Sequence, residues 1–258
     1  MMTWTPLFRL ALIVFLSLCS RLTGLGATYA QITSAEMNNN GAVAFRAILN
    51  GGDIFPAGVF LSLPGTPTVA IAVEGAESAV AGLKYHRLSD RLAFNNQADV
   101  LFPAMLDDEV GAVFLFDKQD RAVRVLLEAA DLPEGHLLVV DSASFDLNDA
   151  GDAAFSVLAS APCSSPPCSS LVSKWQLYFS DSRTGETRVI AEAEQLAPGG
   201  GTIQGFEGVR LNEQGAVVFQ TRINPEQQGL FRYSQTNGLE RLLATGEPLA
   251  GFGGRRIL

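Results

Sequence analysis

The sequence predicts an all-β protein, organised as a β-propeller-like array of four antiparallel, four-stranded blade repeats. Three observations lead to this prediction. A short motif recurs four times, roughly every 55 residues. Apolar residues alternate with period two after each copy, which is typical of strands. Each copy then continues through a polar turn into further short apolar stretches. Radial repetition of such small sheets makes a β-propeller.

The recurring motif is N-x-x-G-x-V-x-F, and it starts at Asn38, Asn95, Asn148 and Asn212. Asn at the start of a turn bonds its side chain to nearby backbone, and Gly is favoured at the fourth position. Ala98 replaces the Gly in the second copy. The motif therefore predicts a tight turn that leads into a strand. Its defining residues are Asn38, Gly41, Phe45, Asn95, Phe102, Asn148, Gly151, Phe155, Asn212, Gly215 and Phe219.

Each copy continues with two more strand-like stretches after the motif strand. The first is short and aromatic, at 58–61, 111–116, 175–179 and 229–233. The second follows a polar turn, at 69–73, 123–127, 187–191 and 239–244. In the fourth copy this turn contains Asn237-Gly238, a strong hairpin signal. A weaker apolar segment then leads to the next Asn, so we expect three clear strands and a weak fourth in each repeat.

The first 30 residues are predicted to be a signal peptide, which leaves 31–258 as the repeat domain. They contain no acidic residue, and Arg9 precedes the nine-residue apolar run 10–18. A transmembrane helix needs about 20 apolar residues, so this run is too short to span a membrane. The residues Thr28-Tyr29-Ala30 place cleavage near Ala30. The mature protein is therefore predicted to be extracytoplasmic, with no transmembrane span.

Cys19 offers an alternative to simple secretion, because lipoprotein signals carry a cysteine at the processing site. Leu18 stands directly before it, where such signals normally carry a small residue. Lipidation at Cys19 is therefore the minority hypothesis.

The repeat resembles the choice-of-anchor tandem-repeat proteins, a family named for its NxxGxVAF motif. Asn38, Gly41 and the run 43–45 match every defined position of that name. The resemblance covers essentially all of residues 31–258. It implies an exported bacterial repeat protein, tethered to the cell surface in many members by a carboxy-terminal anchor. It implies no catalytic residues.

Two arrangements of the chain ends remain open in the sequence. In the first, the four repeats are an incomplete ring within a longer array. In the second, residues 31–37 and the end of the fourth repeat share one closing blade of a four-bladed ring. Propellers need their edge strands covered, because open strand edges pair with other chains. The first arrangement is favoured.

Residues typical of catalytic or metal sites are scarce. His86 and His136 are the only two histidines, and no HExxH spacing or G-x-S-x-G elbow occurs. Asp146, Asn148 and Asp152 surround Gly151 and form a weak candidate for Ca²⁺. Asx turns explain these oxygens more simply. No cofactor is predicted.

Cys163 and Cys168 flank Ser-Ser-Pro-Pro within the third repeat. The C-x4-C spacing without further ligands is weak as a metal site. In an exported protein the expected state of this pair is a local disulfide.

The acidic balance, a net charge of −9, argues against nucleic acid as a partner. The sequence thus favours a non-enzymatic, secreted or cell-surface binding and display module, with an unidentified protein or glycan ligand. One alternative is an extracytoplasmic propeller enzyme, a glycan hydrolase or lyase with carboxylates gathered from several blades. Another is a purely structural envelope component. Fold class alone does not choose among them.

Overall fold

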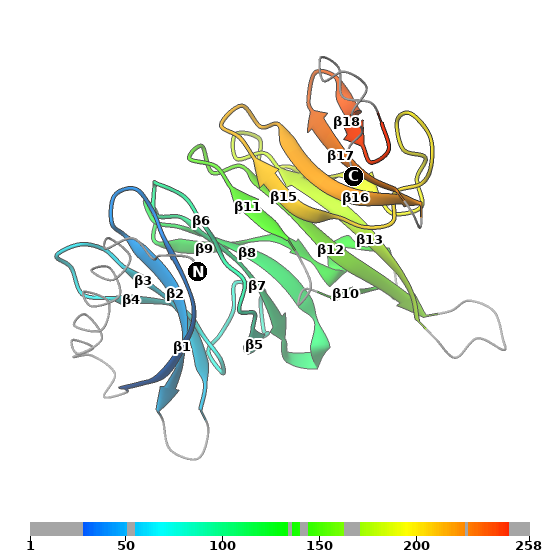
Figure 1. Cartoon of the computed structure of the whole chain (residues 1–258). Coiled ribbons are helices and arrows are strands. Elements are labelled where there is room, and N and C mark those ends of the chain that lie inside the picture. The colour runs from blue at the N-terminus through cyan, green and yellow to red at the C-terminus, as the bar shows by residue number, and fades with distance from the viewer. Residues whose placement is uncertain are drawn as a thin grey trace, which may run out of the picture.

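The computed structural model describes residues 28–50, 55–133, 136–139, 144–162, 171–224 and 227–247. These residues form four antiparallel sheets that stand side by side in an open arc (Figure 1). The described helical structure is limited to two 3-10 turns, Asp107–Glu109 and Ala129–Asp131. Among the described residues, no helix is long and apolar enough to cross a membrane. The predicted all-β, propeller-like class is therefore confirmed, and the described sheets form no closed ring.

Each sheet is formed by one continuous stretch of chain. Sheet 1 consists of β1 (Thr28–Met37), β2 (Val43–Asn50), β3 (Ala57–Ser62) and β4 (Val69–Val73). Sheet 2 consists of β5 (Tyr85–Leu88), β6 (Ala93–Phe94), β7 (Val100–Leu106), β8 (Gly111–Asp117) and β9 (Ala122–Glu128). Sheet 3 consists of β10 (Leu137–Val139), β11 (Phe145–Leu147), β12 (Ala153–Pro162), β13 (Leu171–Ser180) and β14 (Thr187–Glu192). Sheet 4 consists of β15 (Glu207–Leu211), β16 (Val217–Asn224), β17 (Gln227–Ser234) and β18 (Gly238–Ala244).

The boundaries of the sheets differ from the predicted repeat in one respect. The weak strand that leads into each motif Asn pairs with the motif strand that follows it, so it belongs to the same sheet. In sheets 2 and 3 this first strand is split in two, β5 with β6 and β10 with β11. Sheet 1 has its own first strand, β1, and sheet 4 has four strands of its own. The end of the fourth repeat lies outside the described residues, so the arrangement in which the two chain ends share one blade stays a prediction.

The phenylalanine of the motif forms the same aromatic pair in every sheet. It lies directly opposite an aromatic residue of the next strand, and the two rings stack with centroids 5.4 to 5.6 Å apart. Such pairs stabilise a sheet beyond the area that they bury. The four pairs are Phe45–Phe60, Phe102–Phe114, Phe155–Tyr178 and Phe219–Phe231.

A third aromatic ring joins each pair from the first strand of the sheet or the residue before it. In sheet 1 this ring is Tyr29, which meets Phe45 and Phe60 edge-on at 5.6 and 5.3 Å. The equivalent rings of the later sheets are Tyr85, Phe145 and Phe206. Residues 28–30 therefore lie in a paired strand, and cleavage after Ala30 would remove Tyr29 from this cluster.

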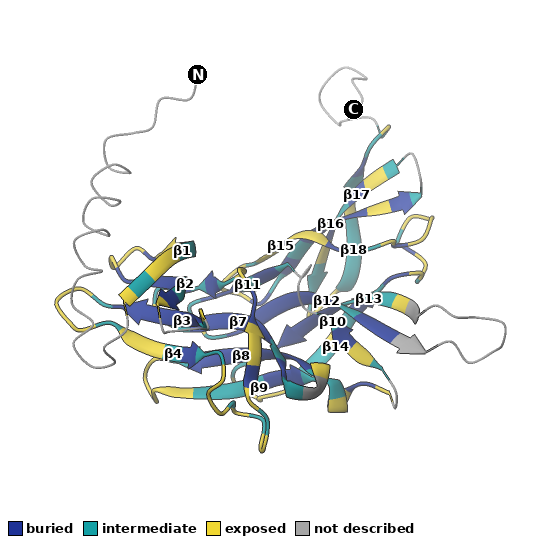
Figure 2. Ribbon diagram, turned by 90° about the horizontal axis from the view of Figure 1, so that it is seen from below, coloured by how far each residue is buried: buried dark blue, intermediate teal, exposed yellow. Residues whose placement is uncertain are grey.

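Figure 2 shows that the buried residues lie along the strands of the four sheets. Between neighbouring sheets, the aromatic pair of sheets 2, 3 and 4 packs on the facing side of the sheet before it, which is mainly aliphatic in sheets 1 and 2 and contains Phe179 in sheet 3. Between sheets 1 and 2, for example, Phe102 and Phe114 pack in one cluster with Val59 and Leu61. This alternation follows from the period of two along each strand, which sends successive side chains to opposite faces. Burial raises the pKa of Tyr85, in this same cluster, to about 12.

The outward face of sheet 4 departs from this pattern. Arg232 occupies the place that Leu61, Leu115 and Phe179 hold in the other sheets, opposite the residue before the motif Phe. It is exposed and paired with Glu240 at 2.6 Å. Gln220 and Arg222 on the same face are exposed as well. Sheet 4 thus presents a polar face on this side.

Candidate functional site

The motif asparagines form a hydrogen-bonded ladder that joins the four sheets. In each copy the Asn Oδ1 accepts the backbone N–H two or four residues later, which closes the turn. The Nδ2 donates to the backbone oxygen of the Asn in the next repeat. These distances are 3.0 Å from Asn38 to Asn95, 2.8 Å from Asn95 to Asn148 and 3.1 Å from Asn148 to Asn212. The motif is therefore an inter-sheet clamp as well as a turn.

A second row of hydrogen bonds joins the residues that directly follow the motif asparagines. The N–H of Asn39 donates to Asn96 Oδ1 at 3.0 Å, and the N–H of Asn96 donates to Asp149 Oδ1 at 2.7 Å. The N–H of Asp149 donates to the Glu213 carboxylate at 3.1 Å. The carboxylates in these turns are thus occupied with holding neighbouring repeats together.

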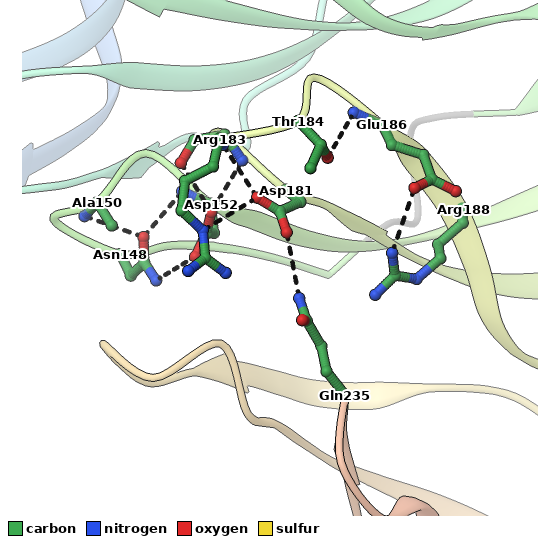
Figure 3. A network of polar contacts seen from close by, with 10 residues as sticks. Asn148, Ala150, Asp152, Asp181, Arg183, Thr184, Glu186, Arg188 and Gln235 are labelled. Atoms are coloured by element: carbon green, nitrogen blue, oxygen red, sulfur yellow. Dashed lines mark hydrogen bonds and ion pairs between the residues drawn. The ribbon is translucent and has the colours of Figure 1, made fainter.

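The predicted Ca²⁺ candidates lie at or beside this ladder, and their oxygens accept hydrogen bonds from the protein itself. Figure 3 shows two of them, Asn148 and Asp152. Asp146 Oδ2 accepts the Leu211 N–H at 2.7 Å. Asn148 Oδ1 accepts two backbone N–H groups, and Asp152 Oδ1 accepts the backbone N–H and hydroxyl of Ser182. Within the described residues, no group of three or more His, Cys, Asp or Glu could hold a metal ion. The contacts support the Asx-turn interpretation.

A buried carboxylate links sheets 3 and 4 near these turns. Asp181 accepts hydrogen bonds from the Arg183 backbone N–H at 2.9 Å and from Gln235 of sheet 4 at 3.2 Å (Figure 3). Burial by itself raises the pKa of Asp181. The hydrogen bonds and the Arg183 guanidinium outweigh it, so the pKa lies below its ordinary value. Its role in the structure is a link between two sheets.

The remaining predicted residues form no shared site. His86 is exposed on β5, and the His136 ring lies 2.8 Å from the Pro133 carbonyl oxygen in a surface turn. Cys163 and Cys168 lie outside the described residues, as does the predicted signal peptide up to residue 27.

A hollow with a volume of about 420 Å³ lies at the inner edges of the sheets. Residues from all four sheets line it, from β1, the β5–β6 connection, the start of β11, and β15. The volume falls within the range of small-ligand pockets. The lining residues are Ser34, Glu36, Asp90, Arg91, Leu92, Ser144, Phe145, Gly208 and Arg210.

One wall of the hollow is fixed by a largely buried arginine behind it. Arg46 of β2 donates to Asp90 at 2.7 Å and to the hydroxyl of Thr33 at 3.1 Å. It also lies 3.8 Å from Glu74, whose two oxygens accept the N–H groups of Ala57 and Leu88. The Asp90 carboxylate is therefore paired with an arginine from the neighbouring sheet, which also lies beside Glu74.

The opposite wall is fixed by side chains of sheet 3. Ser144 Oγ accepts the N–H of Val209 at 3.2 Å, and Asp146 accepts the N–H of Leu211. These bonds hold β15 on both sides of Arg210. One Arg210 nitrogen, Nη1, donates to the Val209 carbonyl at 2.8 Å, which orients the guanidinium.

Three charged side chains at the hollow are left available. Glu36, Arg91 and Arg210 are exposed, and none forms an ion pair with another described residue. Guanidinium groups are strong donors to carboxylates, and a carboxylate accepts hydroxyl hydrogens. The hollow can therefore hydrogen-bond a polar ligand without breaking existing ion pairs.

A family model described as a family of unknown function, DUF7453, matches residues 33–256. The match extends over most of the chain. The chain belongs to this family. The family description supplies no activity for the DUF7453 chain, and no curated protein matches it.

Several solved structures have a distant likeness to the DUF7453 chain. A six-bladed β-propeller lectin from Aleuria aurantia, described with a novel fucose recognition mode, has a TM-score of 0.40 at 10% identity, over 86% of this chain and 67% of the lectin. A GH43 β-1,3-galactosidase with galactodeoxynojirimycin has a TM-score of 0.38 at 12% identity, over 86% and 79%. A protein of unknown function from Dyadobacter fermentans has a TM-score of 0.38 at 12% identity, over 84% and 73%. Likenesses this distant do not decide a function.

Sequence reasoning on this DUF7453 chain missed the hollow. Its residues lie on the weak strands before each motif Asn, where the apolar pattern is least regular. The one signal that could have found them is positional. Arg91 stands four residues and Arg210 two residues before a motif Asn, Arg91 in the connection between β5 and β6 and Arg210 on β15.

Proposed function

We propose that the protein is an exported, non-enzymatic repeat protein that binds a glycan in the hollow between the inner strands. The observation that carries this proposal is the hollow itself, because all four sheets contribute to it. Serine hydroxyls, charged groups and the apolar side chains of Leu92 and Phe145 line one space. This mixture suits a ligand with many hydroxyls and apolar ring edges. A protein partner, and kinship with the choice-of-anchor repeat proteins, remain predictions from the sequence.

Export is part of the proposal and rests on the signal-like segment, with a revised cleavage point. Thr28 and Tyr29 pair with Asn50 and Leu49 in sheet 1, and Tyr29 completes the aromatic cluster. We therefore expect cleavage before Thr28, which keeps this strand whole. Intact mass of the secreted protein checks this. A mature chain starting at Gln31 would contradict the revised cleavage point, and a retained leader would contradict export.

Glycan binding is tested on the secreted protein by a glycan array, followed by titration of each hit. Glu36→Trp places a bulky ring in the hollow, so we expect it to abolish binding. Glu77→Trp makes the same change at an exposed side chain that does not line the hollow, and it should bind like the natural protein. Equal binding by both variants would place the ligand elsewhere.

The two alternatives give different results in the same experiment. If bound glycans are cleaved and new reducing ends appear, the protein is an enzyme, and Glu36 and Asp90 are the carboxylates to examine first. If no glycan binds the natural protein, the binding proposal fails and the structural role is favoured.

A further inference from the structure

The charges at the hollow are not equally available to a ligand. Glu36, Asp90, Arg91 and Arg210 line it, but Asp90 is already bound by Arg46 at 2.7 Å. One carboxylate and two guanidinium groups then remain without an ion pair among the described residues. The chain as a whole carries a net charge of −9. Two guanidinium groups without an ion pair at one hollow can together bind a ligand carboxylate.

The two guanidinium groups come from different sheets. Arg91 lies between β5 and β6 of sheet 2, and Arg210 lies on β15 of sheet 4. Sheet 3 stands between these sheets and contributes Ser144 and Phe145 to the same hollow. Arg210 is oriented by its bond to the Val209 carbonyl and retains free N–H donors. Arginine binds carboxylates through paired, charge-assisted hydrogen bonds.

We infer that the hollow binds an acidic saccharide, with a sugar carboxylate held by Arg91 and Arg210. Glu36 bonds hydroxyls of the same ligand, and Leu92 and Phe145 contact its apolar ring edges. This inference rests on the proposed glycan-binding function and specifies the class of glycan.

The test uses matched pairs of ligands that differ in the carboxylate alone. Oligogalacturonate, oligoalginate and hyaluronan oligosaccharides, each beside its carboxyl-reduced form, are titrated into the secreted protein by calorimetry. We expect at least one acidic oligosaccharide to bind at least tenfold more tightly than its reduced form, because charge-assisted hydrogen bonds are worth that much. Its affinity should fall as salt rises, since the arginines are exposed.

The variants assign the effect to the two arginines. Arg91→Gln and Arg210→Gln should each weaken binding of the acidic form about tenfold or more and leave the reduced form unchanged. Arg222→Gln removes an exposed arginine on β16 that does not line the hollow, so its affinity should match the natural protein within twofold. Circular dichroism confirms that each variant is folded.

The outcomes separate this inference from the proposed function. If neutral or carboxyl-reduced glycans bind as well as the acidic ones, or if neither arginine variant affects binding, the acidic ligand is wrong and glycan binding stands. If the array and the titrations show no glycan binding by the natural protein, the proposed function fails and the inference fails with it.

Discussion

Asn148→Ala is expected to destabilise the protein by about 3 kcal/mol, since it leaves several buried polar groups without partners. Asn148 is 1% exposed. Its Oδ1 accepts the N–H groups of Ala150 and Asp152, and its Nδ2 donates to Asp152 and to the Asn212 carbonyl at 3.1 Å. The substitution therefore breaks the turn and the link to sheet 4 together. Urea unfolding followed by circular dichroism measures the loss.

Asn212→Ala is the matched control for the ladder. Asn212 closes the same turn, with bonds from Gln214 and Ala216, but its side chain is exposed and bonds no further repeat among the described residues. Water replaces the lost acceptor there, so we expect a loss of about 1 kcal/mol or less. The difference between the two losses in free energy of unfolding measures how much the hydrogen bond to the next sheet contributes to stability. Equal losses would show that the asparagine acts only within its own turn.

Phe155→Ala is expected to destabilise the protein by about 4 kcal/mol, the cost of a large cavity in a packed core. The side chain is completely buried between sheets 2 and 3, where it belongs to one cluster with Val113 and Leu115. Its ring stacks on Tyr178 at 5.6 Å and lies 6.4 Å from Phe145. Backbone pairing on both sides of β12 prevents the site from collapsing, so most of the cavity should remain.

Phe55→Ala makes the same truncation at a phenylalanine that is 62% exposed, just before β3. We expect a change within about 0.5 kcal/mol. If Phe155→Ala cost no more than Phe55→Ala, the packing between sheets 2 and 3 would not hold the array together. Comparable losses for Phe102→Ala and Phe219→Ala would show that the motif phenylalanines play one role in every sheet.

Much of the fold could be predicted from the sequence because its signals are local. The turn at each motif needs only an Asn and a residue that tolerates positive φ a few positions later. Gly41, Gly151 and Gly215 adopt φ values of 75°, 83° and 74°, and Ala98 in the second copy adopts 69°. The period-two pattern after each turn likewise placed Phe45, Phe102, Phe155 and Phe219 in buried strands. Four sheets of antiparallel strands follow from these short patterns repeated four times.

The contacts between sheets could not be predicted in this way. The weak strand before each Asn carries too irregular a pattern to show which neighbour it pairs with, and the predicted repeat therefore began one strand late. Nothing local shows that the Asn95 amide meets the carbonyl of Asn148, 53 residues away. The turn by itself explains why an asparagine stands at that position. The bond from its Nδ2 to the next repeat therefore adds no further pattern to the sequence.

The sequence by itself thus determined the repeat, the strands and the buried aromatic residues, because each depends on side chains a few positions apart. The tertiary structure alone decided the ladder, the charged outer face of sheet 4 and the hollow. Glu36, Asp90, Arg91, Ser144 and Arg210 line that hollow from four sheets. They meet only because the sheets pack face to face and bring their inner edges together, and a linear pattern does not record that packing.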